Sequence, residues 1–287
     1  MTAVVPQICV LACGMRTTLP LADTRGITGQ AAKGRPTEFV QSLDRGLAVI
    51  RAFSAERPEL TLSEVARATG LSRAAARRFL LTLESLNYVG NNGRQFFLKP
   101  RVLDLGYAYL SSFSVSEIAQ SHLEELSSRL HESCSASVLD GGDIIYTARA
   151  ATNRIMTIGL SVGRRLPAYA TSMGRVMLSA LPPEELDSYF AGHDRPSLTS
   201  RTVTSEPELR VILNQVRQRG WALIDQELED GVRSVAAPVH DASRQVVAAI
   251  NVSAHASRVT VTNLQRQFLP ELLATAESIS TDLVARR

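Results

Sequence analysis

The chain has 287 residues, of which 45% are hydrophobic and 21% charged, and its net charge is +3. This composition is that of a globular protein long enough for two compact domains. No apolar run approaches the ~20 residues that a membrane-spanning helix needs, and no basic residue precedes the short apolar run near the N-terminus, as a secretion signal would require. We therefore expect a soluble, cytoplasmic protein with no membrane partner.

The three cysteines are Cys9, Cys13 and Cys134. They are too few and too unevenly spaced for a disulfide framework. Cys9 and Cys13 are four residues apart, which allows a metal half-site, but no histidine lies near them and two residues of a loose tail are the simpler interpretation. Cys134 fits a buried small hydrophobic residue. We expect neither a metal site nor a cofactor.

The charge is unevenly distributed along the chain. Residues 38–100 contain nine basic and six acidic residues, whereas residues 101–287 contain 18 basic and 21 acidic ones. A basic N-terminal part followed by an acidic C-terminal part predicts that the N-terminal part binds a polyanion. Residues 1–37 mix small, polar, Gly and Pro residues without periodicity, so we expect a disordered tail there.

Three short helices are predicted after the tail. The apolar residues between Ser42 and Ala55 have the spacing of an amphipathic helix, with Ser42 as the expected N-cap. Thr61 to Glu64 forms a capping box that opens a second helix, and Gly70 ends it. Ser72 then caps a third helix. Two short helices joined through a Gly turn predict a helix-turn-helix.

A β-hairpin and a linker are predicted next. Two short β-prone segments, at residues 88–89 and 95–98, flank a turn rich in Asn and Gly, which is the pattern of a wing. After Pro100, apolar residues that include Tyr109 and Leu110 repeat at helical spacing. We therefore assign residues 38–100 to a winged helix-turn-helix domain and residues 101–113 to a linker helix.

Residues 114–287 alternate helical and strand patterns without an internal repeat. A strong hairpin turn lies at 140–143, a further strand is expected at 155–160, and a closing helix interrupted near Pro270 is expected at 264–284. The remaining predicted helices cover 118–130, 172–181 and 206–219, and one more begins at 182. The remaining predicted strands cover 136–139, 144–148, 221–225, 234–239 and 246–253. This mixture predicts an antiparallel sheet covered by helices, an α+β sensor domain.

The third helix carries the candidate DNA contacts. Arg73 and Arg77 share one face, Arg78 is adjacent, and Ala74 is small enough to let the helix approach DNA. Arginine binds guanine through two hydrogen bonds, while a helix N-terminus can hold a phosphate. A solvated helix face is the competing interpretation, but the flanking capping box, Gly turn and hairpin favour DNA. The predicted DNA-binding residues are Ser72, Arg73, Ala74, Arg77, Arg78 and Arg94.

Two segments are candidates for a ligand site. Residues 163–175 place Thr171 and Ser172 at a helix start, where backbone amides can hold the carboxylate of a small organic acid, or where the residues only cap the helix. In residues 225–234, strand alternation would put Asp225 and Glu227 on one face. Two acids there can serve acid–base chemistry, bind a metal or accept hydrogen bonds from ligand hydroxyls, or one of them can pair with Arg233. No nucleophile–base pair is visible, so catalysis is disfavoured.

From about Phe39 to the C-terminus the chain resembles the IclR (isocitrate lyase regulator) family of bacterial transcription regulators. The segments that carry the resemblance are residues 42–47, 166–175, 225–227, 231–234 and 249–253. Within the family the chain is most similar to the subgroup that regulates protocatechuate and 4-hydroxybenzoate breakdown, the β-ketoadipate pathway. The tail of residues 1–37 has no counterpart in this resemblance.

The resemblance implies a GAF-like α/β effector-binding domain, homodimers that often pair into tetramers, and binding of double-stranded operator DNA in response to a small organic acid such as protocatechuate or 4-hydroxybenzoate. It implies an effector pocket formed by Ser172, Met173, Asp225, Ser234, Asn251 and Ser253. In some relatives a serine stands at the position of Asn251, and Asn offers both a donor and an acceptor that suit a phenolic hydroxyl. Three alternatives stay open: a different acid such as glyoxylate or pyruvate, an enzyme that uses Asp225 and Glu227 beside a DNA-binding module, and a constitutive architectural DNA binder.

Overall fold

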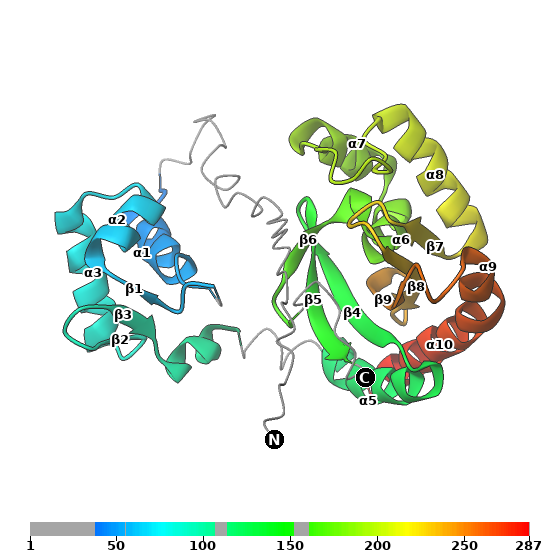
Figure 1. The fold of residues 1–287 in the computed structure, drawn as a ribbon, viewed down its shortest axis with the longest axis horizontal. Coiled ribbons are helices and arrows are strands. Elements are labelled where there is room, and N and C mark those ends of the chain that lie inside the picture. Colours follow the sequence, from blue (N-terminus) through cyan, green and yellow to red (C-terminus); the bar gives the residue numbers. More distant parts are fainter. Residues whose placement is uncertain (1–37, 55, 107–113, 152–160, 287) are drawn as a thin grey trace, which may run out of the picture. The chain divides into compact units, whose positions relative to one another are not determined.

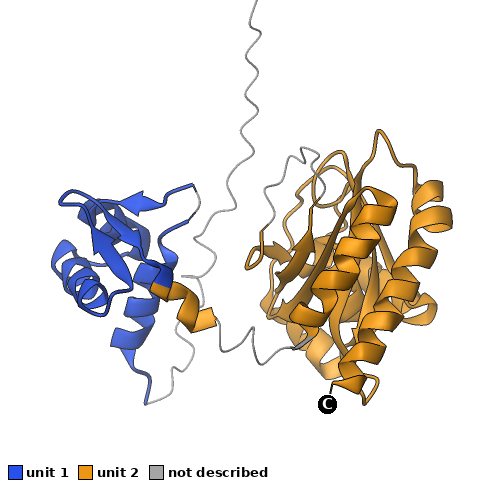
Figure 2. Cartoon of the chain, turned by 90° about the horizontal axis from the view of Figure 1, so that it is seen from below, with its two compact units in different colours: residues 1–100 blue, residues 101–287 orange. Residues whose placement is uncertain are grey.

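The computed structural model describes residues 38–54, 56–106, 114–151 and 161–286. The predicted tail of residues 1–37, the strand at 155–160, and Tyr109 and Leu110 of the predicted linker lie outside the described residues. The chain forms two compact units, residues 1–100 and residues 101–287 (Figure 2). Among the described residues, no helix is long and apolar enough to cross a membrane.

The first unit is a winged helix-turn-helix. Its elements in chain order are α1 (Gln41–Arg51), β1 (Glu59–Leu60), α2 (Leu62–Thr69), α3 (Arg73–Ser85), β2 (Val89–Asn91) and β3 (Phe96–Leu98) (Figure 1). The strands form an antiparallel sheet in the order β1-β3-β2. Val49, Val65 and Leu80, one from each helix, are completely buried in a shared core. The sequence missed β1, because a strand of two residues is too short to show alternation.

Local capping rules explain most helix ends in this unit. Thr61 and Glu64 form the predicted capping box, with the Glu64 carboxylate 2.8 Å from the Thr61 amide. Gly70 ends α2 at a φ of 66°, in the left-handed region where glycine is favoured. The prediction for Ser42 was wrong. Helix α1 begins two residues earlier than a cap at Ser42 would place it, with Val40 at the N-cap and no side-chain cap, because the Val40 carbonyl already accepts the first hydrogen bonds of the helix.

The second unit is a six-stranded antiparallel sheet with helices on both faces, as the sequence predicted. Its strand order is β6-β5-β4-β9-β8-β7. The strands are β4 (Ser133–Asp140), β5 (Asp143–Ala150), β6 (Arg165–Pro167), β7 (Ala222–Asp225), β8 (Val232–His240) and β9 (Val246–His255). The helices are η2 (Pro100–Leu103) at the boundary between the units, α5 (Ser114–Leu130), η3 (Ala168–Ala170), α6 (Ser172–Ala180), α7 (Pro183–Gly192), α8 (Glu206–Arg219), α9 (Val261–Asn263), η4 (Leu264–Phe268) and α10 (Leu269–Ala285).

Each face of this sheet is covered by its own hydrophobic core. Helices α5 and α10 pack on one face, against side chains such as Ile250 and Val252 of β9. Helices α6, α7 and α8 pack on the other face, where Ala236 of β8 and Ala249 of β9 lie (Figure 1). Because successive side chains of a strand point to opposite faces, every second residue of β9 belongs to the α6 side. The site described below lies on that side.

A β-bulge at Thr147 changes the face to which β5 contributes. Ser137 of β4 pairs with Tyr146, whereas its neighbour Ala136 pairs with Ala148, so Thr147 has no partner in the ladder. As a result Tyr146 belongs to the core on the α6 side, while Ala148 belongs to the core under α5 and α10. Simple alternation would have placed both residues on one face.

The closing helix differs from the prediction in the way it accommodates Pro270. The chain passes through a π-helical turn, η4, before α10 begins at Leu269. Pro270 therefore lies in the first turn of α10, where a missing backbone N–H leaves no hydrogen bond unmade.

Candidate functional site

Helix α3 presents a basic, exposed face. The Ser72 hydroxyl caps the helix by accepting a hydrogen bond from the Ala75 amide at 3.2 Å. Ala76, Leu80 and Leu83 are buried on the opposite side, so the helical period leaves the other face in solvent. The predicted residues on α3 are all exposed, namely Arg73, Ala74, Arg77 and Arg78.

The wing between β2 and β3 exposes Arg94. The Asn92 side chain shapes the turn by accepting hydrogen bonds from the amides of Arg94, at 3.2 Å, and Gln95, at 2.8 Å. Gly93 has a φ of 93°, which only glycine adopts without strain. In the part of the chain that the structure describes, Arg73, Arg77, Arg78 and Arg94 make no salt bridge, so their charges are available to an anionic partner.

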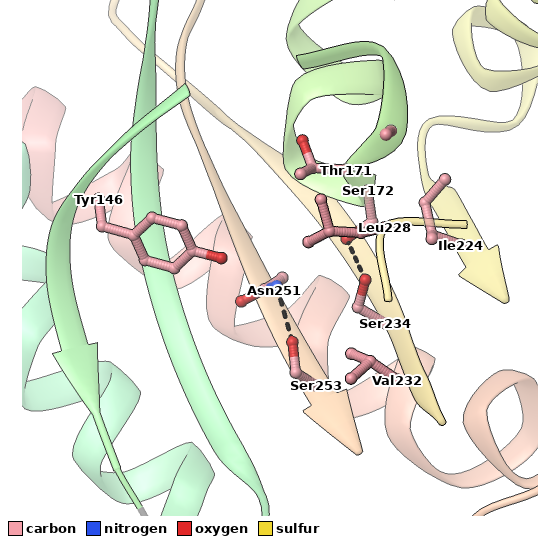
Figure 3. A pocket seen from close by; sticks show the side chains of 10 residues that line it. Tyr146, Thr171, Ser172, Ile224, Leu228, Val232, Ser234, Asn251 and Ser253 are labelled. Carbon is pink, nitrogen blue, oxygen red and sulfur yellow. Dashed lines mark hydrogen bonds between the residues drawn. The ribbon is translucent and has the colours of Figure 1, made fainter. Parts of the chain in front are cut away.

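The second unit contains a pocket on the α6 side of the sheet, beside the start of α6 (Figure 3). Four of the six predicted effector residues line it: Ser172, Ser234, Asn251 and Ser253. The other lining residues are Tyr146, Ala170, Thr171, Ile224, Leu228 and Val232.

Strand register brings the polar residues of the pocket together. Ser234 of β8 lies directly opposite Ser253 of β9, and Asn251 is two residues away on the same face. The Ser172 hydroxyl at the start of α6 is 2.8 Å from the Ser234 hydroxyl, and the Asn251 amide nitrogen donates to the Ser253 hydroxyl at 3.0 Å. The pocket wall on this side is therefore polar but uncharged.

Met173 and Asp225, the other two predicted effector residues, do not line the pocket. Met173 is buried, and its sulfur accepts a hydrogen bond from Ser137 at 3.3 Å. The Asp225 carboxylate binds the Arg233 guanidinium and lies 3.2 Å from that of Arg201. Burial alone would raise the pKa of Asp225, but the hydrogen bond and charge of Arg233, aided by Gln226 and Arg201, hold this pKa below its usual value.

The expected acid pair is not present. Strand β7 ends at Asp225, and Gln226 has a φ of 64°, so the alternation that would have placed Asp225 and Glu227 on one face stops there. The chain turns, and Glu227 points into the protein instead of joining Asp225. The two carboxylates thus belong to separate ion pairs, and neither pairs with a base in a catalytic arrangement.

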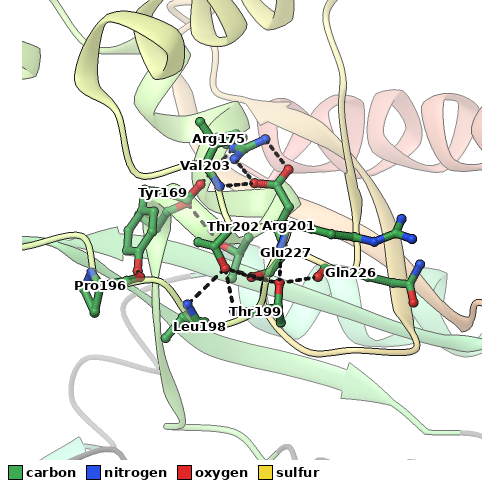
Figure 4. A network of polar contacts seen from close by, with 12 residues as sticks. Tyr169, Arg175, Pro196, Leu198, Thr199, Arg201, Thr202, Val203, Gln226 and Glu227 are labelled. Carbon is green, nitrogen blue, oxygen red and sulfur yellow. Dashed lines mark hydrogen bonds and ion pairs between the residues drawn. The ribbon is translucent and has the colours of Figure 1, made fainter.

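Glu227 forms a buried, bidentate ion pair with Arg175 of α6 (Figure 4). The two guanidinium nitrogens lie 2.8 and 2.5 Å from the two carboxylate oxygens, and the side chains are only 3% and 12% exposed. The Arg175 Nε donates to the carbonyl of Tyr169 at 2.8 Å, and the Val203 amide donates to Glu227 at 3.1 Å. Both charges are therefore hydrogen-bonded, as buried charges must be.

Two threonines extend this network to the backbone. The Thr199 hydroxyl donates to the Gln226 carbonyl at 2.7 Å, and the Thr202 hydroxyl donates to the Glu227 carbonyl at 2.6 Å. The segment between β7 and β8 is consequently held at several points. Because Leu228 of this segment lines the pocket, the network fixes one pocket wall relative to the start of α6.

The pocket lining combines polar, uncharged groups with an apolar wall. Among the described residues, no charged side chain lines it and no cluster of three His, Cys, Asp or Glu side chains could hold a metal. The Thr171 hydroxyl caps α6 by accepting from the Gly174 amide at 3.1 Å, and the amides of Ser172 and Met173, which precede it, have no acceptor within the helix. A carboxylate is favoured at a helix start. Ile224, Leu228 and Val232 provide the apolar wall.

Sequence reasoning missed Tyr146 and the apolar wall. The pattern of β5 does not reveal the bulge at Thr147, so it gives no signal that Tyr146 faces the pocket rather than the opposite core. Leu228 and Val232 lie where β7 has ended and β8 begins, and periodicity assigns no face to a turn.

Family models match nearly the whole described chain. The model for the IclR helix-turn-helix domain matches residues 42–93, and the model for the C-terminal part of the bacterial transcriptional regulator IclR matches residues 107–281.

The chain is similar, in sequence or in structure, to three known proteins. The chain is 47% identical to the Pca regulon regulatory protein of Pseudomonas putida, over 88% of this chain and 87% of that protein. A crystal structure of a protein from Rhodococcus sp. RHA1 is 53% identical, with a TM-score of 0.78, and covers 87% of this chain and all of that one. The inducer-binding domain of the transcription factor PobR from Acinetobacter, a double mutant in complex with 3-hydroxybenzoic acid, is 34% identical, with a TM-score of 0.55, over 57% of this chain and 96% of that one.

Proposed function

Because the chain belongs to the IclR family of bacterial transcription regulators, we propose that it controls genes of aromatic-acid catabolism, binding operator DNA through its first unit and a small aromatic acid in the pocket of its second. It acts in the cytoplasm as a sensor and does not catalyse a reaction. The proposal that the second unit binds an acid rests on the uncharged, hydroxyl-lined pocket at the start of α6. The regulator of the Pca regulon and the PobR domain with its bound hydroxybenzoic acid support an aromatic acid.

The DNA half of the proposal rests on α3 and the wing. Helix α3 enters the major groove with Arg73 and Arg77 toward base edges, and Ala74 allows close approach. Ser72 and Arg78 contact the phosphate backbone, and Arg94 reaches the backbone or the minor groove from the wing. These assignments are supported by the exposure of all six residues and by the free arginine charges.

The ligand half places the carboxylate and the ring at different parts of the pocket. The carboxylate binds the first amides of α6 near Ser172, and the ring packs against Ile224, Leu228 and Val232. Ser234, Asn251 and Ser253 form the polar wall. Met173 and Asp225 support the pocket without lining it. Met173 of α6 is buried, and Asp225 forms an ion pair with Arg233.

The effector changes DNA affinity by binding one conformation of a homodimer, or of a pair of dimers, better than another. A ligand with equal affinity for both conformations would change nothing. The proposal therefore requires that the response to the acid and the binding of the acid be lost together.

The test is a fluorescence-anisotropy titration of the full chain onto its own upstream intergenic DNA, at fixed salt because phosphate contacts make affinity salt-dependent. The titration is repeated with protocatechuate, 4-hydroxybenzoate, pyruvate, glyoxylate and β-ketoadipate. We expect specific binding that changes with an aromatic acid. A change only with an aliphatic acid would leave a regulator with a different effector, and no preference over random DNA would refute the proposal.

Matched variants locate the two sites. Ser253→Ala should abolish the response to the acid while DNA binding without the acid persists. Ser243→Ala, in the exposed turn between β8 and β9, is the control that should keep the response. Incubation of the protein with each acid should return the acid unchanged, and turnover would favour an enzyme.

A further inference from the structure

The pocket is smaller than the acid proposed for it. It encloses a cavity of about 20 Å³. A cavity holds one water molecule when its volume reaches roughly 10–15 Å³, whereas a cavity that takes up benzene measures roughly 150 Å³. A wall of the pocket must therefore move outward before an aromatic acid can bind.

One part of the pocket wall lies at the protein surface. Of the ten described residues that line the pocket, eight are buried, and only Leu228 and Val232 are partly exposed (Figure 3). Val232 belongs to β8 and pairs with His255 of β9. Leu228 belongs to the connection between β7 and β8, outside any helix or strand. Leu228 is therefore the part of the wall that can move with the least loss of regular structure.

The connection that carries Leu228 is anchored at both ends. The carbonyls of Gln226 and Glu227 accept hydrogen bonds from the two threonine hydroxyls described above, and the Gly231 carbonyl accepts from the Ala256 amide at 2.7 Å. Between these anchors, residues 228–230 make a single hydrogen bond with the described residues, through one carbonyl. The base of this wall is thus fixed, and its tip is held mainly by the Leu228 side chain in the pocket.

Gln226 and Gly231 mark the two ends of the loosely held tip. Both have a left-handed backbone conformation, with φ of 64° and 81°. Two hydrogen bonds join these ends: the Gln226 amide donates to the Val232 carbonyl at 2.8 Å, and the Gln226 Oε1 accepts from the Gly231 amide at 3.1 Å. The Gln226 Nε2 also donates to Asp225 at 3.2 Å. The Gln226 side chain therefore ties the tip closed, and a substitution can remove this tie while the backbone bond stays.

We propose that residues 228–230 form a lid over the pocket, with Gln226 and Gly231 as its hinges and the Gln226 side chain as the tie that holds it closed. The lid opens to admit the acid, and Leu228 then packs against the bound acid. The identity of the acid rests on the proposed function, whereas opening of the lid is a property of the protein alone. Because Glu227 binds Arg175 of α6, one ion pair links the base of the lid to the helix at which the carboxylate binds.

The first experiment measures lid opening without any acid. Ser253→Cys places a thiol in the pocket, and Ser234→Cys is a second reporter on the neighbouring strand. Cys9 and Cys13 of the full chain are replaced by serine. Reaction of the reporter thiol with methyl methanethiosulfonate is followed by mass spectrometry. We expect it to be at least about tenfold slower than in the urea-unfolded protein, because the reagent reaches the thiol only through local opening.

A lid variant and a matched control identify what opens. Gln226→Met keeps the length of the side chain but removes the tie to Gly231, so the reporter thiol should react roughly two- to tenfold faster, the effect of one hydrogen bond on the opening equilibrium. Gln218→Met, at an exposed position of α8, should leave the rate unchanged. Cys134 is buried in the opposite core and should stay unreacted throughout, which shows that the opening is local.

The second experiment adds an acid to the wild-type chain. Hydrogen exchange of the amides in residues 228–230 is measured by mass spectrometry with and without saturating 4-hydroxybenzoate or protocatechuate. We expect the acid to slow exchange in this segment, because Leu228 gains a contact when the lid closes over the acid. Leu228→Ala should lose most of this protection.

The outcomes distinguish the lid from the proposed function. A reporter thiol that reacts as fast as in the unfolded chain, one that reacts only together with Cys134, or one whose rate is the same in Gln226→Met and Gln218→Met would overturn the lid. A reaction that Gln226→Met accelerates, combined with no effect of either acid on exchange, would keep the lid and overturn the aromatic effector of the proposed function.

Discussion

The proposed DNA-binding surface and the proposed effector pocket are built on opposite principles. Arg73, Arg77 and Arg94 are exposed and make no salt bridge within the described residues, and local signals place them: a Ser cap, a Gly turn and an Asn-rich hairpin. The pocket residues are buried, and strands far apart in the sequence bring them together. A surface that binds a polyanion needs free charges on a small scaffold, whereas a pocket that distinguishes small molecules needs side chains held from several directions. Substitutions should therefore act on binding in the first unit and on packing in the second.

The largest effect is expected at the buried ion pair of the second unit. Arg175→Met leaves the Glu227 carboxylate buried without its partner, which costs about 3–5 kcal/mol of folding stability. The double variant Arg175→Met/Glu227→Met should recover much of this loss. Calorimetric unfolding measures both. The control is Arg286→Ala at the exposed pair with Glu117, where about 0–1 kcal/mol is expected. A single variant as stable as the wild type would contradict a structural role for the pair.

Glycine-to-alanine substitutions in α6 of the second unit and α1 of the first unit should change stability in opposite directions. A Cβ on Gly174 of α6 would lie 2.2 Å from the backbone oxygen of Ala168, so Gly174→Ala should destabilise the second unit by about 1–3 kcal/mol or more. A Cβ on Gly46 of α1 would meet only a ring carbon of Phe79 at 3.8 Å. Gly46→Ala should therefore stabilise α1 by up to about 1 kcal/mol, through helix propensity. Urea denaturation of both variants tests the opposite signs; a stabilised Gly174→Ala would refute the close packing of α6 on η3.

A substitution on the exposed face of α3 should weaken DNA binding without lowering the stability of the first unit. Arg77→Ala removes a proposed base contact, so affinity for the operator should fall by about 1–3 kcal/mol with no change in the unfolding temperature. Arg266→Ala, an exposed arginine of the second unit, carries the same charge change as a control. Anisotropy titrations at one salt concentration compare the two. Equal losses for both variants would show a general charge effect rather than a contact by α3.

The smallest effect concerns acid pH. Because Asp225 has a lowered pKa in the folded protein, its contribution to stability is present above its ordinary pKa near 3.8 and is lost as the pH falls through the folded value. Asp225→Asn should therefore reduce stability at neutral pH and have less effect in strong acid. Urea unfolding at pH 7 and pH 3 measures the difference. A difference that grows in acid would contradict the lowered pKa.

The same contrast explains what could be predicted from the sequence. The winged helix-turn-helix, the antiparallel sheet and the hairpin at 140–143 follow from caps, turns and periodicity, which act over a few residues. The helix start at Ser172 was predicted from the residues, whereas Ser234, Asn251 and Ser253 were predicted only through the family resemblance; all four border one pocket.

Other parts of the site depend on interactions that periodicity does not encode. The bulge at Thr147 decides the face of Tyr146, and the left-handed Gln226 sends Glu227 to Arg175 instead of beside Asp225. Both are single-residue departures from regular alternation. They are fixed by tertiary contacts, so the local sequence gave no sign of them.

The position of β9 in the sheet has a practical consequence. This strand is hydrogen-bonded on both sides, by β4 and β8, and its Ile250 and Val252 anchor it in the opposite core. Asn251 and Ser253 are therefore side chains on a backbone that other residues already hold in place. Such positions can be exchanged to retune ligand preference while the scaffold survives, which makes this strand the first place to randomise when converting the protein into a biosensor for new aromatic compounds.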